Sequence, residues 1–309
     1  MRQPLFNEMD YACGRMGMTL LHSILLGIVQ GLTEFLPVSS SGHLAIIQNL
    51  FHLDIGEGVL FDILLHIGTL GAVLVVYRKE IWQLIVETLG MIADLFFNLR
   101  LRAKRRKGET QERFRCIVSN NYRKMAVLMI VSTIPTALIG LMAGKVVADA
   151  ARTLIVPGIC LVVTAVFLFL SDRADEEGKI PRDINYREGV IVGIAQGLSV
   201  LPGLSRSGVT IAACLFCGFE RSFAVKYSFI LSIPAILGAA VLEISQAASE
   251  PVMLSMIGIY LAGMLAAGLV GYLCIRWMLQ VVRNRKFTYF AVYCLLVGIL
   301  AIVLHFFVS

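Results

Sequence analysis

The sequence predicts an all-α integral membrane protein, and three observations support this fold class. First, 58% of the 309 residues are hydrophobic and the mean hydropathy is +0.80. Second, only 16% of the residues are charged, against about 25% in soluble domains, which excludes a soluble enzyme and a disordered or coiled-coil chain. Third, the apolar runs approach or exceed about 18 residues, as membrane-spanning helices require, whereas the strands of a membrane barrel alternate over about ten residues.

Six segments are apolar and long enough to cross a bilayer whose hydrocarbon core is about 30 Å thick. They are residues 59–77, 125–144, 153–171, 222–243, 252–273 and 287–307. A bundle that shares one apolar core predicts a single membrane domain over residues 1–309. Residues 1–18 lack an apolar stretch ahead of a small-residue cleavage site, so we expect no cleavable signal peptide.

Two further apolar regions, residues 20–50 and 190–218, are each interrupted by a cluster of Gly, Pro and Ser. Each half is too short to span the membrane, so we expect re-entrant helix–loop–helix elements. Broken backbone at membrane depth is tolerated only where it is buried in protein or lines a wet cavity. Residues 81–97 carry Glu87 and Asp94 among apolar residues, which predicts an amphipathic helix lying in the membrane interface.

Most of the 27 Lys and Arg residues fall on one side of the membrane when the chain is threaded through these spans. The four that fall on the other side are Arg2, Arg15, Lys145 and Arg152. The positive-inside rule then predicts that the basic loop 100–124 is cytoplasmic and that both termini are outside. We interpret the basic run within this loop as an anchor for anionic lipid, because nucleic acid is not an expected partner.

An internal repeat is the most informative feature of the sequence. Residues 27–42 read GIVQGLTEFLPVSSSG and residues 193–208 read GIAQGLSVLPGLSRSG, so eight of the sixteen positions are identical at an offset of 166. Three predicted spans separate the two copies, so the second copy enters from the opposite face. We therefore predict an inverted-topology repeat, with repeat one at about 20–171 and repeat two at about 188–309. Such repeats place a site near the midplane, where the broken helices meet.

The two copies carry different polar side chains at the positions where a functional site would need different chemical groups. The first supplies Gln30, Glu34, Ser39, Ser40, Ser41 and His43, and the second supplies Gln196, Ser205, Arg206, Ser207 and Thr210. Ionisable groups at membrane depth are costly and are therefore candidates for function. A guanidinium suits phosphate oxygens, and serine hydroxyls beside the N–H groups of a helix start make an anion cradle. A carboxylate and a histidine opposite this cradle can hold a cation or water and move a proton, which points to phosphoryl transfer.

Other interpretations remain open at four positions. Ser39 and Ser41 are as well suited to capping the half-helix that follows as to chemistry. Asp62 and His66 lie one helical turn apart in the predicted span 59–77. They either form a second polar face near the site or mark the outer end of that helix.

The two loop sequences resemble the motifs of the undecaprenyl-pyrophosphate phosphatase family, whose members are also called bacitracin-resistance proteins. Residues 30–43, QGLTEFLPVSSSGH, are similar to the first motif, and residues 202–210, PGLSRSGVT, match the second, P-G-x-S-R-S-x-x-T, at every fixed position. The resemblance covers nearly the whole chain and is weakest in the basic loop 98–124. It implies a membrane phosphatase that hydrolyses undecaprenyl pyrophosphate to undecaprenyl phosphate and inorganic phosphate. Such an enzyme recycles the lipid carrier for cell-wall synthesis and confers bacitracin resistance.

The resemblance also implies roles for the candidate residues. Arg206 would bind the phosphates together with nearby hydroxyls and would neutralise developing charge. These hydroxyls belong to Ser39, Ser41, Ser205, Ser207 and Thr210. Glu34, helped by Gln30, would orient the attacking group and hold a divalent cation, Mg²⁺ or Ca²⁺, unless the cation binds the substrate's pyrophosphate instead. The nucleophile is left open between His43, Ser40 and water, and His43 would otherwise act as the acid or base.

The expected partners are a polyprenyl pyrophosphate lipid and membrane lipid, and a homodimer is left open. A lipid-carrier flippase or secondary transporter is the alternative function, because inverted repeats with broken helices also build transporters. In that case Glu34 and Arg206 would pair to stabilise the core. Type-2 phosphatidic acid phosphatases need a histidine where this chain has Ala212, so we exclude that class.

Overall fold

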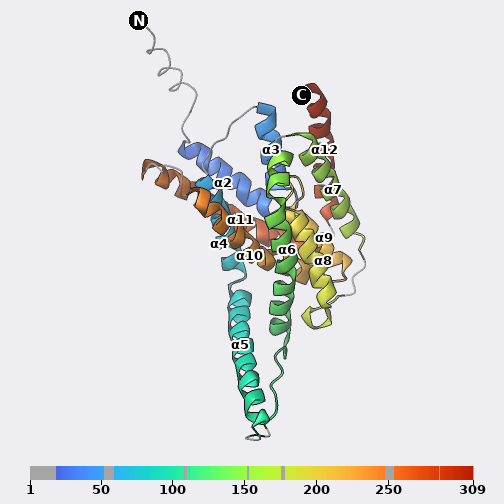
Figure 1. Ribbon diagram of the computed structural model, residues 1–309. Helices are drawn as coiled ribbons and strands as arrows, with labels where there is room; N and C mark the ends of the chain where they lie inside the picture. Colours follow the sequence, from blue (N-terminus) through green and yellow to red (C-terminus); the bar gives the residue numbers. More distant parts are fainter. Residues whose placement is uncertain are drawn as a thin grey trace.

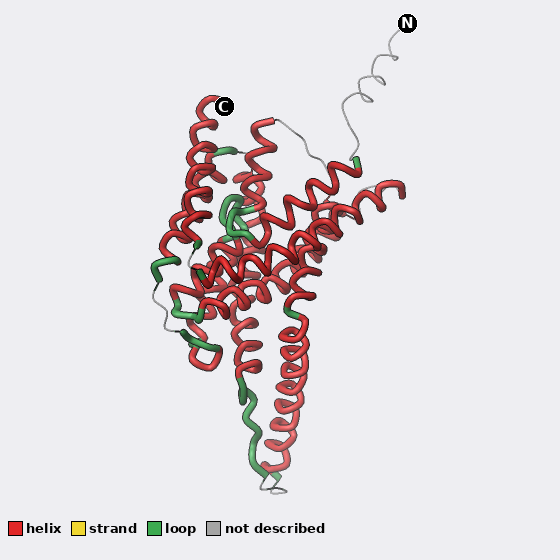
Figure 2. The backbone as a smooth tube through the Cα atoms, turned by 180° about the vertical axis from the view of Figure 1, so that it is seen from behind, coloured by secondary structure: helices red, strands yellow, loops and turns green. Residues whose placement is uncertain are grey.

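The computed structural model describes residues 19–51, 59–107, 110, 112–151, 153–174, 178–247, 254–284 and 286–308. This part of the chain is helical and contains no strand longer than a single bridge (Figures 1 and 2). The helices are α2 Leu20–Phe35, α3 Ser40–Phe51, α4 Val59–Val76, α5 Arg78–Arg106, α6 Asn121–Ala151, α7 Ile155–Ser171, the 3-10 helix η1 Pro181–Asp183, α8 Tyr186–Leu198, α9 Arg206–Phe216, α10 Arg221–Ala247, α11 Leu254–Arg283 and α12 Phe287–Val308. Residues 1–18, on which the signal-peptide prediction depends, lie outside the described residues.

The predicted all-α membrane fold is confirmed by the length and composition of these helices. Among the described residues, four stretches are apolar and long enough to cross a membrane. They are Asn121–Gly144, Arg221–Glu243, Met256–Arg283 and Phe287–Phe307. Helices α4 and α5 count as a fifth if they are taken as one span bent by 84°. The predicted span 153–171 is the shorter apolar helix α7, so length and composition alone support fewer spans than the six we predicted.

The amphipathic segment predicted at residues 81–97 lies within a longer helix, α5, which has 29 residues. Figure 1 shows α5 extending away from the other helices, beside the chain segment that leads into α6. One face of α5 exposes apolar side chains, of which Trp82 is 67% exposed. On the opposite face, Arg123 of α6 pairs with Glu87 at 2.8 Å and with Asp94 at 2.7 Å. Glu87 and Asp94 therefore tie α5 to α6.

Each of the two interrupted regions forms a pair of helices joined by a short turn. Helix α2 ends at Phe35 and α3 begins at Ser40, while α8 ends at Leu198 and α9 begins at Arg206. The second turn requires Gly203, whose φ of +95° is in the left-handed region that glycine adopts without strain. A Cβ atom at this position would also lie 2.3 Å from the Pro157 carbonyl oxygen.

The first helix of each pair packs closely against a long helix from the other half of the chain. Helix α2 packs against α11, and α8 packs against α6. A Cβ atom at Gly27 would lie 2.2 Å from the Gly263 oxygen, and one at Gly193 would lie 2.1 Å from the Ser132 oxygen. Small residues allow helix backbones to approach closely inside a membrane. Gly27 and Gly193 are equivalent at the offset of 166, so close packing gives a physical reason for their recurrence.

The two turns also contact each other. A Cβ atom at Gly42 would lie 2.6 Å from Gly203 Cα, and one at Gly208 would lie 3.1 Å from Pro37 Cβ. At the offset of 166, Gly42 corresponds to Gly208 and Pro37 corresponds to Gly203. Each of the two contacts is therefore the counterpart of the other. Related copies that face each other would make such contacts. They bring the end of α2 next to the start of α9.

Candidate active site

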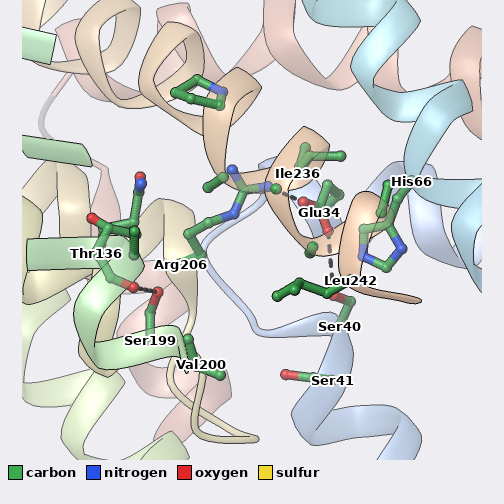
Figure 3. Close-up of a pocket in the computed structure, with 18 of the residues that line it drawn as sticks. Glu34, Ser40, Ser41, His66, Thr136, Ser199, Val200, Arg206, Ile236 and Leu242 are labelled. Atoms are coloured by element: carbon green, nitrogen blue, oxygen red, sulfur yellow. Dashed lines mark hydrogen bonds and ion pairs between the residues drawn. The ribbon is translucent and has the colours of Figure 1, made fainter. Parts of the chain in front are cut away.

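A cavity of about 700 Å³ lies where the two turns meet helices α4, α6 and α10 (Figure 3). One part of its wall carries hydroxyl, amide and ionisable side chains, and the other part is apolar. The polar residues include Glu34, Ser39, Ser40, Ser41, His66, Thr136, Gln196, Ser199, Ser205, Arg206 and Glu243. The apolar residues include Ile63, Ala137, Leu141, Val200, Leu204, Ile236 and Leu242. The shape and lining suit a molecule with a charged head and an apolar tail.

Glu34 and Arg206 form an ion pair within this cavity. Glu34 lies in the last turn of α2 and Arg206 opens α9, and the guanidinium Nη2 donates a hydrogen bond to Glu34 Oε1. Their side chains are 7% and 21% exposed. Gln30 Nε2 donates to Glu34 Oε2 at 3.1 Å, and Ser40 Oγ lies 3.5 Å from the same oxygen. Because a buried charge is costly without a partner, each member of the pair depends on the other.

The serines of the repeated Ser-x-Ser-Gly motif cap helices in both copies. Ser39 Oγ accepts a hydrogen bond from Gly42 N at 3.2 Å, and Ser205 Oγ accepts one from Gly208 N at 3.2 Å. The second serine hydroxyl lies near the first, at 3.4 Å in the first copy and at 3.3 Å in the second. Ser39, Ser41 and Ser205 also line the cavity. Capping and a place in the cavity wall are therefore compatible at these positions.

Ser207 and Thr210 are buried in contacts between helices, and neither lines the cavity. Ser207 Oγ donates to the Leu36 carbonyl oxygen at 3.3 Å. Thr210 Oγ1 donates to the Arg206 carbonyl oxygen at 2.7 Å and contacts Ser228 Oγ on α10. These two hydroxyls therefore hold α9 in place behind the Arg206 guanidinium.

His43 lies on α3 outside the cavity wall, and both of its ring nitrogens have partners. Nδ1 is 2.7 Å from the Ser39 carbonyl oxygen, and Nε2 is 2.8 Å from the Tyr293 hydroxyl of α12. The imidazole also stacks on the Tyr293 ring. The histidine that lines the cavity is His66 of α4. Of the two roles left open for His66 by the sequence, the structure favours the one near the site, while Asp62 is not among the lining residues.

Five polar lining residues were not among the candidates named from the sequence: Thr33, Thr133, Thr136, Ser199 and Glu243. Ser199 is the counterpart of Thr33 at the offset of 166, and Thr33 also lines the cavity, so a closer comparison of the two copies would have found it. Thr136 and Glu243 come from the long helices α6 and α10 and belong to no motif. Gln196 was named and lies in the wall, and its Oε1 is buried without a hydrogen-bond partner among the described residues.

The donors around Glu34 do not form a protein cage for a divalent cation. One carboxylate oxygen is paired with Arg206, and Gln30 presents its N–H to the other. No group of three or more His, Cys, Asp and Glu side chains that could hold a metal occurs in the described part of the chain. Mg²⁺ binds an octahedron of oxygens and often takes several of them from substrate phosphates and water. The predicted ligands Glu34 and Gln30 therefore do not fit a site that binds a cation without substrate.

The fold and the cavity define a class of helical membrane protein in which two broken helices meet at a buried carboxylate–guanidinium pair. The chain belongs to the family described as bacitracin resistance protein BacA, whose family model matches residues 23–300. This confirms the family predicted from the two loop motifs. A relative from Alkaliphilus metalliredigens, named undecaprenyl-diphosphatase, is 40% identical over 285 residues, which cover 92% of this chain and 98% of the relative.

Two further relatives with the same name show equally broad similarity. The protein of Methanosphaera stadtmanae is 38% identical over 285 residues, which cover 92% of this chain and 98% of the relative. The protein of Desulforapulum autotrophicum is 39% identical over 289 residues, which cover 94% of this chain and 99% of the relative. The similarity thus extends over whole chains and is not confined to the motifs.

Proposed function

We propose that this protein is a multi-pass membrane phosphatase that hydrolyses undecaprenyl pyrophosphate to undecaprenyl phosphate and inorganic phosphate. The observation that carries the proposal is the buried Glu34–Arg206 pair in a cavity that combines polar and apolar walls. The whole-chain similarity to undecaprenyl-diphosphatases supports the same reaction. The lipid phosphate returns to cell-wall synthesis, and the activity confers bacitracin resistance.

The pyrophosphate binds at the start of α9. The helix N-terminus attracts anions, and the Arg206 guanidinium offers paired N–H donors to phosphate oxygens. Ser39, Ser41 and Ser205 add hydroxyls from the cavity wall. Ser207 and Thr210, whose hydroxyls are engaged between helices, act by holding Arg206 in position.

Glu34 orients the attacking group. Its Oε2 lies 3.5 Å from Ser40 Oγ, so it is placed to accept a hydrogen bond from Ser40 or from a water molecule beside it. His43, the third candidate nucleophile, has both nitrogens engaged outside the cavity wall. Ser40 or water therefore attacks the terminal phosphorus, while the phosphorus bond to the bridging oxygen breaks and the lipid phosphate leaves.

A divalent cation, Mg²⁺ or Ca²⁺, would neutralise charge on the pyrophosphate and would be held mainly by phosphate oxygens. Glu34 is the protein group that would hold it, with Gln30 beside it.

The prenyl chain lies along the apolar walls of the cavity. These walls come from α6 and α10, through side chains such as Ala137, Leu141, Ile236 and Leu242. The protein resides in the plasma membrane, with loop 100–124 in the cytoplasm and both termini outside, and the distribution of basic residues supports this orientation.

Release of phosphate by purified protein tests this function. Wild-type protein in detergent, given undecaprenyl pyrophosphate, should release one inorganic phosphate per lipid. A protein that binds this lipid, yet leaves it intact under all cation conditions, would instead favour the flippase or transporter alternative.

A further inference from the structure

We propose that His66 accepts the proton of the attacking hydroxyl, an assignment that rests on the phosphatase function proposed above. His66 lies on α4, and its side chain lines the same cavity as Glu34 and Ser40. Figure 3 shows the imidazole and Ser40 together near Glu34, with Arg206 on the other side of the carboxylate. A proton acceptor must lie within hydrogen-bond reach of the attacking group or one water away from it, and His66 is the described histidine whose side chain lines this cavity.

A hydrogen bond within α4 determines which imidazole nitrogen is the base. Nδ1 lies 2.8 Å from the carbonyl oxygen of Asp62. A carbonyl oxygen only accepts hydrogen bonds, so Nδ1 carries the proton and donates it. The lone pair is then on Nε2, to which no other described residue donates or accepts a hydrogen bond. His66 is therefore held as the tautomer that can take up a proton.

The charged groups near His66 come from four helices. Glu34 of α2 and Asp62 of its own helix interact electrostatically with it, and Glu243 of α10 and Arg206 of α9 line the same cavity. Arg206 is paired with Glu34. Helices α5 and α11, which also pack against α4, contribute none of the described residues that line the cavity.

The proposed step conserves atoms and charge. The oxygen of water or of Ser40 bonds to the terminal phosphorus, and its proton moves to His66 Nε2. The bond from phosphorus to the bridging oxygen breaks, and its electron pair leaves with undecaprenyl phosphate. Attack by water gives inorganic phosphate directly, whereas attack by Ser40 gives a phosphoserine that water hydrolyses in a second, equivalent step. His66 then releases the proton to bulk water.

The pH dependence of kcat and kcat/KM for phosphate release tests this assignment. Wild-type activity should fall on the acidic side, because protonated His66 cannot accept a proton. His66→Gln keeps a polar side chain that does not titrate, so kcat should fall by about 10²-fold or more while the acidic decline disappears. KM should stay within about threefold, since binding rests mainly on Arg206. His43→Gln should keep the acidic decline, whatever its rate.

A matched control and a second variant make the test decisive. His22→Gln, at the exposed start of α2, should behave as wild type. Thermal unfolding in detergent reports whether each variant is folded, and His66→Asn replaces His66→Gln if the latter does not fold. A rate within threefold of wild type, or an acidic decline that persists in the His66 variant, would overturn the assignment. Loss of the decline in His43→Gln alone would move the role to His43. Failure of wild-type protein to release phosphate would count against the proposed function itself.

Discussion

Arg206 and Glu34 show how a buried ion pair can also take part in a binding site. Each charge is withdrawn from water and depends on the other, yet the guanidinium still has N–H donors for a ligand. An anionic phosphate that approaches Arg206 can share it with Glu34, which changes the surroundings of the carboxylate at the moment of binding. The pair is a structural contact that, in the proposed function, would also respond to substrate.

Replacement of Arg206 should abolish turnover. Arg206→Ala should lower kcat/KM by about 10³-fold or more, because the main phosphate contact in the cavity is lost. It should also cost about 3–5 kcal/mol of stability, since the buried Glu34 carboxylate loses its partner of opposite charge. Arg206→Lys should restore little activity, because an ammonium cannot make paired contacts. Phosphate release and thermal unfolding measure both effects.

The matched control for Arg206 is Arg182→Ala, whose side chain is 74% exposed on η1. This variant should match wild type in rate and in melting temperature. Turnover by Arg206→Ala close to that of wild type would remove Arg206 from the site.

The asymmetry between the two loops predicts a division of roles. Glu34→Gln keeps the shape of the side chain and removes its charge, so kcat should fall by about 10²-fold or more. Ser205→Ala should raise the activation free energy of the reaction by only about 1–3 kcal/mol, because Arg206 and backbone donors remain at the start of α9. Steady-state kinetics separates the two effects. If Glu34→Gln raised only KM while Ser205→Ala stopped turnover, the roles assigned to the loops would be reversed.

At the scale of elements, glycines allow the backbones of the broken helices to pack closely against the long helices. Gly27 of α2 faces the Gly263 carbonyl oxygen of α11 at a distance that leaves no room for a methyl group. Gly27→Ala should therefore destabilise the protein by about 1–3 kcal/mol through overpacking. Thermal unfolding in detergent should show a lower melting temperature, with a loss of activity as α2 shifts Glu34.

Gly71→Ala on α4 is the matched control, because nothing beyond its chain neighbours and the backbone of its own helix lies within 4 Å of the added Cβ position. This change should be neutral or slightly stabilising, since alanine favours helix by about 0.5–1 kcal/mol over glycine. Equal melting temperatures for the Gly27 and Gly71 variants would show that the close approach of α2 and α11 is not required.

For the whole molecule, the distribution of basic residues predicts an orientation that labelling can check. Two variants, each keeping one of the seven cysteines, would carry either Cys13 near the N-terminus or the exposed Cys116 in loop 100–124. In intact cells, an impermeant maleimide should label the Cys13 variant and leave the Cys116 variant unlabelled until the cells are opened. The opposite result would invert the predicted topology.

Cation dependence is also predicted for the protein and its substrate taken together. A chelator should reduce phosphate release, and added Mg²⁺ should restore it. Calorimetry of the protein with Mg²⁺ alone should detect no tight site, because Glu34 is paired with Arg206 and Gln30 offers an N–H. Tight binding without substrate that Glu34→Gln removes would instead establish a cation site made by the protein.

The sequence by itself determined the class of fold, the family and the two loops. Long apolar runs, Gly/Pro/Ser interruptions and a sixteen-residue repeat are local signals, so they can be read without knowing which helices are neighbours. The repeat also predicted that Glu34 and Arg206 would lie near the same place, although they are far apart in the chain. The residue types alone were sufficient for this prediction, because a buried charge needs a partner of opposite charge.

Only the tertiary structure decided which side chains face the cavity. His43 belongs to a motif but turns toward Tyr293, whereas His66 belongs to none and lines the cavity. Thr136 and Glu243 reach the cavity from α6 and α10 without a sequence signal. The physical reason is that the direction of a side chain depends on the rotation of its helix, and packing against distant segments sets that rotation.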